Sequence, residues 1–389
     1  MIHLPISMLV AAALTVIGAA QATRIARAAP TAARGSAALT AADMPRATGD
    51  STQSPSSTLL TVDVHPGMEL LAIMAYLGQR YPTPLDSKYK SDVWTYFKRF
   101  RNHPALDSVR SAPLYPDFTE IGLALGDPTR PSAGLPDSSG WYATHGRGRM
   151  TAILKSAARF AKDTRFDAFR QAHAADYVAW STQVKAALAK SNALATVERF
   201  YRDPNGAAPP ARVRLYLEPL NNWGAHQIDI GHASGAPADR IVRFQFGPDG
   251  ASPLPDSPLS FDLDGRGIAT VWHEVGHDFI RPLMSEYEQQ ISALSRLYDS
   301  TDVNLRRQNV TTWRYAFEEN VIRAVVAVVI GTARGQKERD AEVKAQVARG
   351  FVFVPALADL LQREYVGHRD TYPTFERFAP RMLEILAKQ

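Results

Sequence analysis

The chain has 389 residues, 45% of them hydrophobic, which is ample for a globular protein with one large domain or two or three smaller ones. Its net charge is +5, but the basic residues are spread along the chain instead of gathered in runs, so nucleic-acid binding is not indicated. The absence of cysteine excludes disulfides, thiolate zinc sites and cysteine catalysis, and leaves imidazole and carboxylate as the strong zinc ligands.

The N-terminus predicts an export signal in residues 1–22. Residues 4–20 are an apolar stretch, and residues 20–22 (Ala-Gln-Ala) fit a small-x-small cleavage site. The stretch is short for a membrane span of about twenty residues, and an uncleaved anchor is the alternative. Residues 23–58 are dominated by Ala, Thr, Ser and Pro, a composition that predicts a disordered tether. We therefore expect an exported protein, periplasmic or extracellular, that meets a membrane only if this signal is retained.

Residues 59–389 are expected to form the folded, catalytic part, with a helical portion at 59–202 and a sheet plus metal-site portion at 203–389. Hydrophobic periodicity predicts a strand at 59–64 and helices at 68–81, 92–100, 119–125, 151–161 and 165–190. Period-two alternation at 212–217, 227–230 and 241–246 predicts a small, mainly antiparallel sheet. Its edge could accept an extended peptide through backbone hydrogen bonds, or it could be an ordinary hairpin.

The segment 271–280 carries an HExxH motif within an apolar helical pattern that is expected to end at Pro282. Residues i and i+4 share one helix face, so His273 and His277 can direct their rings at a single metal ion. Glu274 lies about 100° around the helix from His273, which suits a general base better than a ligand. Burying these three side chains is costly unless they are paired or metal-bound. The alternative is a surface helix with incidental histidines.

A catalytic zinc site uses three protein ligands and keeps one position open. The buried helical pattern at 312–330 carries two adjacent carboxylates, Glu318 and Glu319, and Glu319 is our choice for the third ligand. The other could pair with Arg314 or Arg323, four or five residues away, and an exposed helix ion pair of this kind is the alternative for both. Weaker ligand candidates are Asp299, Asp302 and His368.

Four segments together resemble a known bacterial family, the one called domain of unknown function 4932. They are residues 62–71 (VDVHPGMELL), 221–226 (NNWGAH), 273–277 (HEVGH) and 318–324 (EENVIRA). HExxH followed by a glutamate on a later helix also looks like the gluzincin metallopeptidases. The resemblance implies zinc ligation by His273, His277 and one of the two glutamates, with Glu274 as the base, and it implies no substrate.

The resulting expectation is an α+β, mostly helical, zincin-like fold with the small sheet beside the HExxH helix. Its function would be that of an exported, zinc-dependent metallopeptidase-like hydrolase acting on a peptide or protein. The oxyanion donor is left open among Tyr315, His226, His232 and Tyr287. The alternative is an exported binding module that keeps a structural or vestigial zinc site without turnover.

Overall fold

The structure is a computed structural model. It describes residues 60–79, 84–112, 116–126, 128, 146–203, 212–221, 224–228, 241–246, 257–261, 263, 265–298 and 302–388. All of them belong to one compact unit, Ser54–Gln389. The predicted export signal and tether lie outside the described residues. Within the described ranges, no helix has the length and apolar character that a membrane crossing requires.

Most of the described residues are helical, as expected for the mostly helical α+β class. The first half contains α1 Pro66–Leu77, α2 Lys88–Phe97, η2 Lys98–Phe100, α3 Leu106–Arg110, η3 Pro116–Leu125, α5 Arg147–Thr164, α6 Phe166–Ala172, α7 Ala174–Lys190 and α8 Ala193–Tyr201. The second half contains α9 Gly265–Glu286, α10 Glu288–Ala293, η5 Ser295–Leu297, α11 Val303–Arg307, α12 Trp313–Arg334, α13 Gln336–Ala348, α14 Val354–Leu360, η6 Leu361–Tyr365, η7 Val366–His368 and α15 Phe375–Ala387.

The described strands form one sheet in the order β1-β2-β4-β3, with β1 Leu60–Asp63, β2 Arg212–Leu217, β3 His226–Gln227 and β4 Ile241–Phe246. Strands β1 and β4 both run parallel to β2, and the short β3 alone pairs antiparallel, with β4. The prediction of a mainly antiparallel sheet was therefore wrong. Alternation of apolar and polar residues does not distinguish parallel from antiparallel strands. Parallel pairing of β1 with β2 requires a crossover connection, which the helices α1 to α8 provide.

Among the predicted helices, the segments 165–190 and 271–280 show the clearest departures from their expected extents. The periodic segment 165–190 is broken at His173, where φ is −104° and ψ is 9°, so α6 and α7 are separate helices. Helix α9 continues through Pro282 instead of ending there. A proline inside a helix loses a backbone hydrogen bond, but Leu283 and Met284 beyond it are buried, and their burial offsets that cost.

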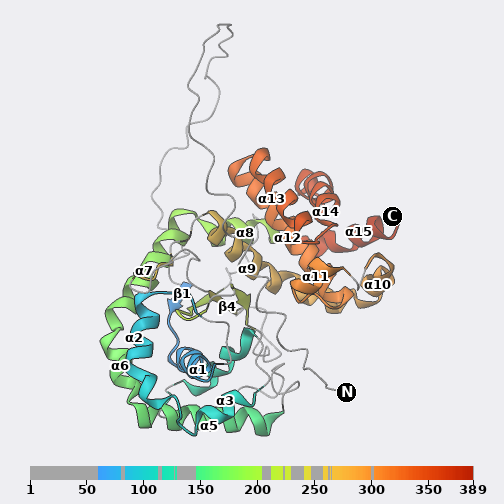
Figure 1. Ribbon diagram of the computed structural model, residues 1–389. Helices are drawn as coiled ribbons and strands as arrows, with labels where there is room; N and C mark the ends of the chain where they lie inside the picture. The colour runs from blue at the N-terminus through green and yellow to red at the C-terminus, as the bar shows by residue number, and fades with distance from the viewer. Residues whose placement is uncertain are drawn as a thin grey trace, which may run out of the picture. The chain divides into compact units, whose positions relative to one another are not determined.

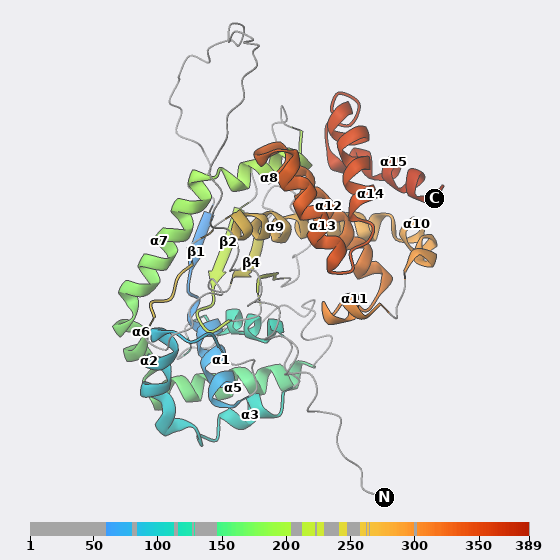
Figure 2. The same cartoon turned by 45° about the horizontal axis from the view of Figure 1, so that its top comes forward.

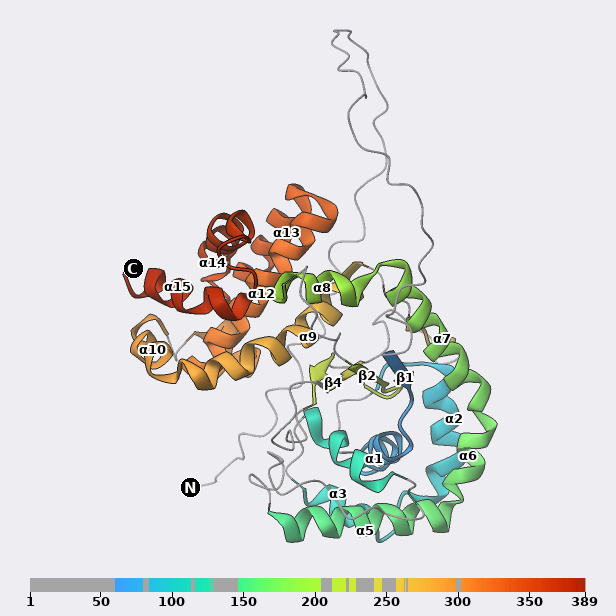
Figure 3. The same cartoon turned by 180° about the vertical axis from the view of Figure 1, so that it is seen from behind.

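Helix α9 lies between the sheet and the C-terminal helices (Figure 1). It contacts β3 and β4, whereas α7 contacts β1 at the opposite edge of the sheet (Figure 2). Seen from behind, α5, α6, α7 and α8 follow one another in an arc around the sheet and α1 (Figure 3). Helix α12 packs along α9 and also contacts α13 and α14. The predicted metal helix is therefore covered by the predicted carboxylate helix.

A buried carboxylate links the helices of the first half. Glu69 on α1 is 1% exposed. Its Oε1 accepts hydrogen bonds from the hydroxyls of Tyr89 and Tyr177, the latter at 2.6 Å, and its Oε2 accepts one from Arg170. Arg170 also donates to the backbone carbonyl of Val64 at 3.1 Å. We call Glu69, Tyr89, Arg170 and Tyr177 the Glu69 cluster; it joins α1, α2, α6 and α7.

Candidate metal centre

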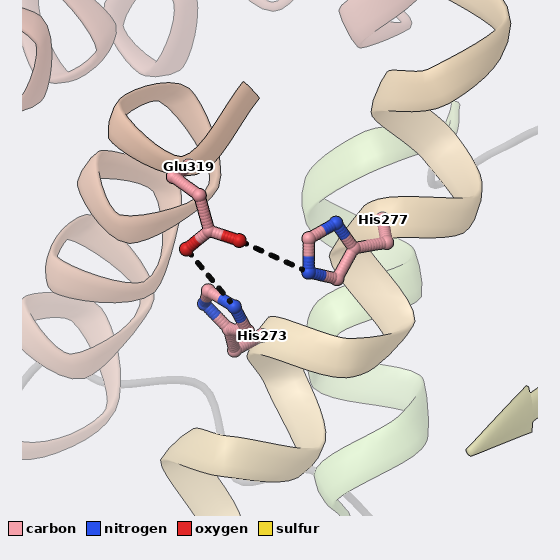
Figure 4. A group of neighbouring side chains, drawn as sticks. All are labelled: His273, His277 and Glu319. Atoms are coloured by element: carbon pink, nitrogen blue, oxygen red, sulfur yellow. Dashed lines mark ion pairs between the residues drawn. The ribbon is translucent and has the colours of Figure 1, made fainter. Parts of the chain in front are cut away.

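Helix α9 supplies the two imidazoles of the site. Its buried apolar residues recur at helical spacing and fix the helix against the core: Ile268, Val271, Trp272, Val275, Ile280 and Leu283. His273 and His277 lie one turn apart on the face that is turned toward α12 (Figure 4). Their ring centroids are 4.9 Å apart and the ring planes differ by 87°. The side chain of His277 is buried, and that of His273 is 15% exposed.

Glu319 on α12 faces both rings. Its Oε2 lies 3.6 Å from Nε2 of His273, and its Oε1 lies 3.6 Å from Nε2 of His277 (Figure 4). One ligand atom from each residue can be chosen so that all lie within 4.8 Å of one another, and no second group of this kind occurs among the described residues. The structure therefore brings together the three residues that the sequence analysis singled out as metal ligands.

Gly276 permits the close approach of α12 to α9. A Cβ atom at Gly276 would lie 3.0 Å from Cγ2 of Ile322 and 3.0 Å from the hydroxyl of Tyr201. Ile322 follows Glu319 by three residues on α12, so it lies on nearly the same face of that helix. A larger residue at position 276 would therefore displace the segment of α12 that carries Glu319.

Glu318 occupies the outer side of His277. Its Oε1 is 2.6 Å from Nδ1 of His277 and accepts a hydrogen bond of 2.9 Å from Nε of Arg281. Nε2 of His277 faces Glu319, so the two glutamates contact opposite nitrogens of one ring. The sequence analysis did not assign Arg281 to the site. Its position four residues after His277 places the two side chains next to each other on the helix and could have indicated this role.

The remaining arginines pair differently from the prediction. Glu319, and not Glu318, accepts hydrogen bonds from Arg323, at 3.0 Å from Nε and 2.7 Å from the terminal nitrogen. Arg314 donates to the backbone carbonyl of Met284 instead of to a glutamate. The suggested pairing of the non-ligand glutamate with Arg314 or Arg323 does not occur, since Glu318 pairs with Arg281. Both hydrogen bonds of Arg323 go to Oε2, the oxygen that faces His273, and they orient the carboxylate of Glu319.

These contacts keep the site in the protonation states that metal binding needs. Burial raises the pKa of Glu319, but the charge of Arg323 and the neighbouring imidazoles outweigh it and hold the value at about 2. Burial, the largest effect, lowers the pKa of His273 well below its usual value, and the attraction of Glu319 opposes it only in part. Glu319 is therefore an anion and His273 a neutral imidazole near pH 7, as zinc ligands must be.

Glu274 is the buried carboxylate of the site that lacks a full set of partners. Its residue is 4% exposed, and its Oε2 has no hydrogen-bond partner among the described residues. Burial raises the pKa of this carboxyl, while the imidazoles of His277 and His226 lower it by smaller amounts. A buried oxygen without a donor is costly, and such groups in native structures call for an explanation in function.

Comparison with known families agrees with part of this picture. Residues 148–385 match the family described as Domain of unknown function (DUF4932). The chain belongs to that family. The match covers the candidate metal centre and starts after the predicted 62–71 motif. No match was found among curated proteins or among solved structures.

Of the other groups considered from sequence, Tyr315 and His226 lie beside the centre in this DUF4932 member. The charges of Glu319, Glu274 and Glu318 all raise the pKa of Tyr315, in addition to burial, which is the largest cause. Nε2 of His226 pairs with the carboxylate of Glu120, a contact that sequence reasoning missed because the two residues lie 106 positions apart.

The remaining candidates lie elsewhere or outside the described residues. The hydroxyl of Tyr287 interacts with Glu286, Asp302 caps the N-terminus of α11, and His368 is exposed and contacts the backbone carbonyl of Arg363. Asp299 and His232 are outside the described residues. Asp278, the acidic residue after the second histidine, is buried.

The donor set of this DUF4932 member fits zinc. Two neutral imidazoles and one carboxylate are a ligand set of catalytic zinc sites, in which water or substrate takes the fourth position. The contacts of His277 with Glu318, and of Glu319 with Arg323, are of the kind that orient the ligands in known zinc sites. Partial exposure of His273 leaves one side of the centre accessible.

Proposed function

We propose that the protein is an exported, zinc-dependent metallopeptidase-like hydrolase of the gluzincin type. The observation that carries the proposal is the convergence of His273, His277 and Glu319 beside the buried Oε2 of Glu274, which has no hydrogen-bond partner among the described residues. A purely structural zinc site is closed by four protein ligands and has no use for such an oxygen. The zincin-like fold and the export signal of residues 1–22 are parts of the same proposal.

His273, His277 and Glu319 would hold the zinc ion. When bound there, zinc lowers the pKa of water toward neutrality and polarises a carbonyl group. Glu318 keeps Nδ1 of His277 engaged, so that Nε2 is the nitrogen available on the side of Glu319. Arg323 holds the carboxylate of Glu319 in place through two hydrogen bonds.

Glu274 would move the proton. Its Oε2 would accept a proton from the water that attacks an amide carbonyl, and the protonated carboxyl would then pass that proton to the leaving amine. A base works best when its pKa lies near the working pH, and burial shifts Glu274 in that direction. The products would be a carboxylate and an amine, so the reaction class is amide hydrolysis, with a peptide or protein as the expected substrate.

Tyr315 is the group best placed to stabilise the oxygen that gains charge. It lies four residues before Glu319 on α12 and therefore on the same face of that helix. The residue is 36% exposed, and its hydroxyl makes no hydrogen bond with the described residues. The same carboxylates that raise its pKa keep the hydroxyl protonated, so it can donate to a substrate oxygen.

The test compares the wild-type protein with Glu274→Gln, both purified with zinc, by metal analysis and by cleavage of a mixed peptide library. Glu274→Gln should retain zinc and lose cleavage by a factor of about 10² to 10⁴. Glu288→Gln, an exposed change on α10, is the matched control and should cleave like the wild type. If the wild type binds zinc but cleaves no peptide, the alternative of a binding module with a structural zinc becomes the better account.

A further inference from the structure

The candidate centre has a strongly basic border at its His273 end. The charges of Arg323 and Arg349 both act on His273, and Arg349 in turn lies close enough to Arg323 and Arg266 to be affected by their charges. Two guanidinium groups, from α12 and from the residue after α13, therefore lie near this metal ligand, and a third, Arg266 at the start of α9, lies near Arg349.

Arg323 is fully engaged within the protein. It donates to Glu319 and, through its other terminal nitrogen, to Oε1 of Gln346 at 2.9 Å. Its guanidinium also lies over the ring of Phe351, 4.0 Å from the ring centroid. Gln346 and Phe351 flank Arg349, whose backbone N–H donates to the carbonyl of Gln346 at 3.0 Å. The segment that carries Arg349 is thus fastened to the same arginine that orients Glu319.

Arg349 itself is free to bind something else. Its guanidinium makes no hydrogen bond or ion pair with any residue that the structure describes, and the residue is exposed. Burial of part of the side chain and the like charges of Arg323 and Arg266 lower its pKa, and Glu342 offsets this only in part. A guanidinium that its neighbours repel gains most from an anion brought in by a ligand.

Arg266 extends the basic border along α9. It precedes His273 by seven residues, two helical turns, so it lies on the same helix face about 10 Å from it along the axis. Like Arg349 it is exposed. A substrate that passes His273 on this side would therefore meet positive charge from α9 and from the end of α13.

We propose that Arg349, with Arg266 beside it, binds a carboxylate of the substrate at the His273 end of the centre. The inference rests on the proposed function and names its substrate class: peptides with an acidic side chain near the cleaved bond, or with a free C-terminal carboxylate close to it. The planar fork of a guanidinium matches the two oxygens of a carboxylate, which makes arginine suited to this recognition.

The experiment measures binding separately from turnover. Zinc-loaded Glu274→Gln protein is titrated with three fluorescent peptides of equal length: one with glutamate side chains and an amidated C-terminus, one neutral with a free C-terminus, and one neutral and amidated. At least one of the first two should bind about tenfold or more tightly than the third, because a hydrogen bond between charged groups contributes at least that factor. The preferred peptide identifies the source of the carboxylate.

Adding Arg349→Ala should remove that preference, whereas Lys344→Ala, which deletes an exposed positive charge on α13, should keep it. Equal binding of the three peptides, binding of none of them, or a preference that survives Arg349→Ala would each overturn the inference. Failure of the proposed hydrolase function is distinguishable, because it would appear as zinc-loaded wild type that cleaves none of the peptides while the binding preference is still present.

Discussion

Glu69 and Glu274 are both buried carboxylates, yet their surroundings differ. Both oxygens of Glu69 accept hydrogen bonds, from two tyrosines and one arginine. Oε2 of Glu274 has no partner among the described residues. The Glu69 cluster joins four helices of the first half, whereas Glu274 lies on α9 in the turn that carries His273 and His277.

The difference separates a structural role from a chemical one. A buried charge stabilises the fold only when its partners compensate for lost water, and removing one partner is then destabilising. A buried oxygen without partners costs stability and is retained where a ligand or reacting group supplies the missing contact. We therefore expect substitutions in the Glu69 cluster to affect folding, and substitutions around Glu274 to affect metal binding or turnover.

The largest expected effect is on folding. Glu69→Gln should lower the free energy of unfolding by about 3 to 5 kcal/mol, because Arg170 loses its counter-charge inside the protein. Urea denaturation followed by circular dichroism measures this change. Zinc stoichiometry of the folded variant should equal that of the wild type. A loss below about 1 kcal/mol, which is what an exposed ion pair contributes, would contradict the structural role of Glu69.

The next effect is on turnover. Tyr315→Phe should lower kcat about 10²- to 10³-fold, the usual loss when one oxyanion donor is removed. Its free energy of unfolding should change by less than about 0.5 kcal/mol, because the residue is partly exposed and its hydroxyl bonds no described residue. Tyr287→Phe is the control, since that hydroxyl interacts with Glu286 and not with the centre. Equal kcat for Tyr315→Phe and wild type would contradict the assignment.

A third effect concerns pH. His65 precedes Glu69 by four residues, and burial, together with the charge of Arg170, lowers its pKa to about 4. Between pH 6.5 and 4 the unfolded chain therefore binds a proton at His65 that the folded chain does not, so stability is lost as pH falls through this range. The loss should reach up to about 3 kcal/mol. Denaturation of His65→Asn at several pH values should show a flatter dependence than wild type; parallel curves would contradict it.

The HExxH geometry could be predicted from sequence because it depends on one helix. His273 and His277 needed nothing but i,i+4 spacing, and Glu319 needed in addition a buried helical pattern far along the chain. The direction of the strands could not be predicted, since β2 alternates in the same way whichever strand it pairs with. The break at His173 was also missed, because hydrophobic periodicity continues across it.

Contacts between distant segments were the other limit. The pairing of His226 with Glu120 joins β3 to η3 and leaves no local pattern. The choice between Glu318 and Glu319 was open for a related reason: adjacent residues on α12 differ by about 100° in direction, and the sequence does not say which direction faces α9. In the structure α12 approaches α9 through Ile322 and Gly276, Glu319 faces both imidazoles, and Glu318 lies beside Nδ1 of His277.

The position of Glu318 beside Nδ1 of His277 leads to the prediction with the smallest expected effect. Glu318→Gln should weaken zinc affinity about 10- to 100-fold, as loss of an outer partner of a metal ligand does, while kcat at saturating zinc changes less. Competition with a chromophoric chelator measures the affinity, and Glu384→Gln, an exposed acidic position on α15, is the control.

Glu318→Gln also removes the contact with Arg281, but we do not expect that loss to explain the weaker zinc binding. The side chain of Arg281 is 35% exposed, so water can replace Glu318 as its partner, whereas Nδ1 of His277 is buried with a side chain 6% exposed. Arg281→Gln should therefore change zinc affinity less than Glu318→Gln. If the two variants weaken binding equally, Glu318 acts through its charge on the centre and not through the orientation of His277.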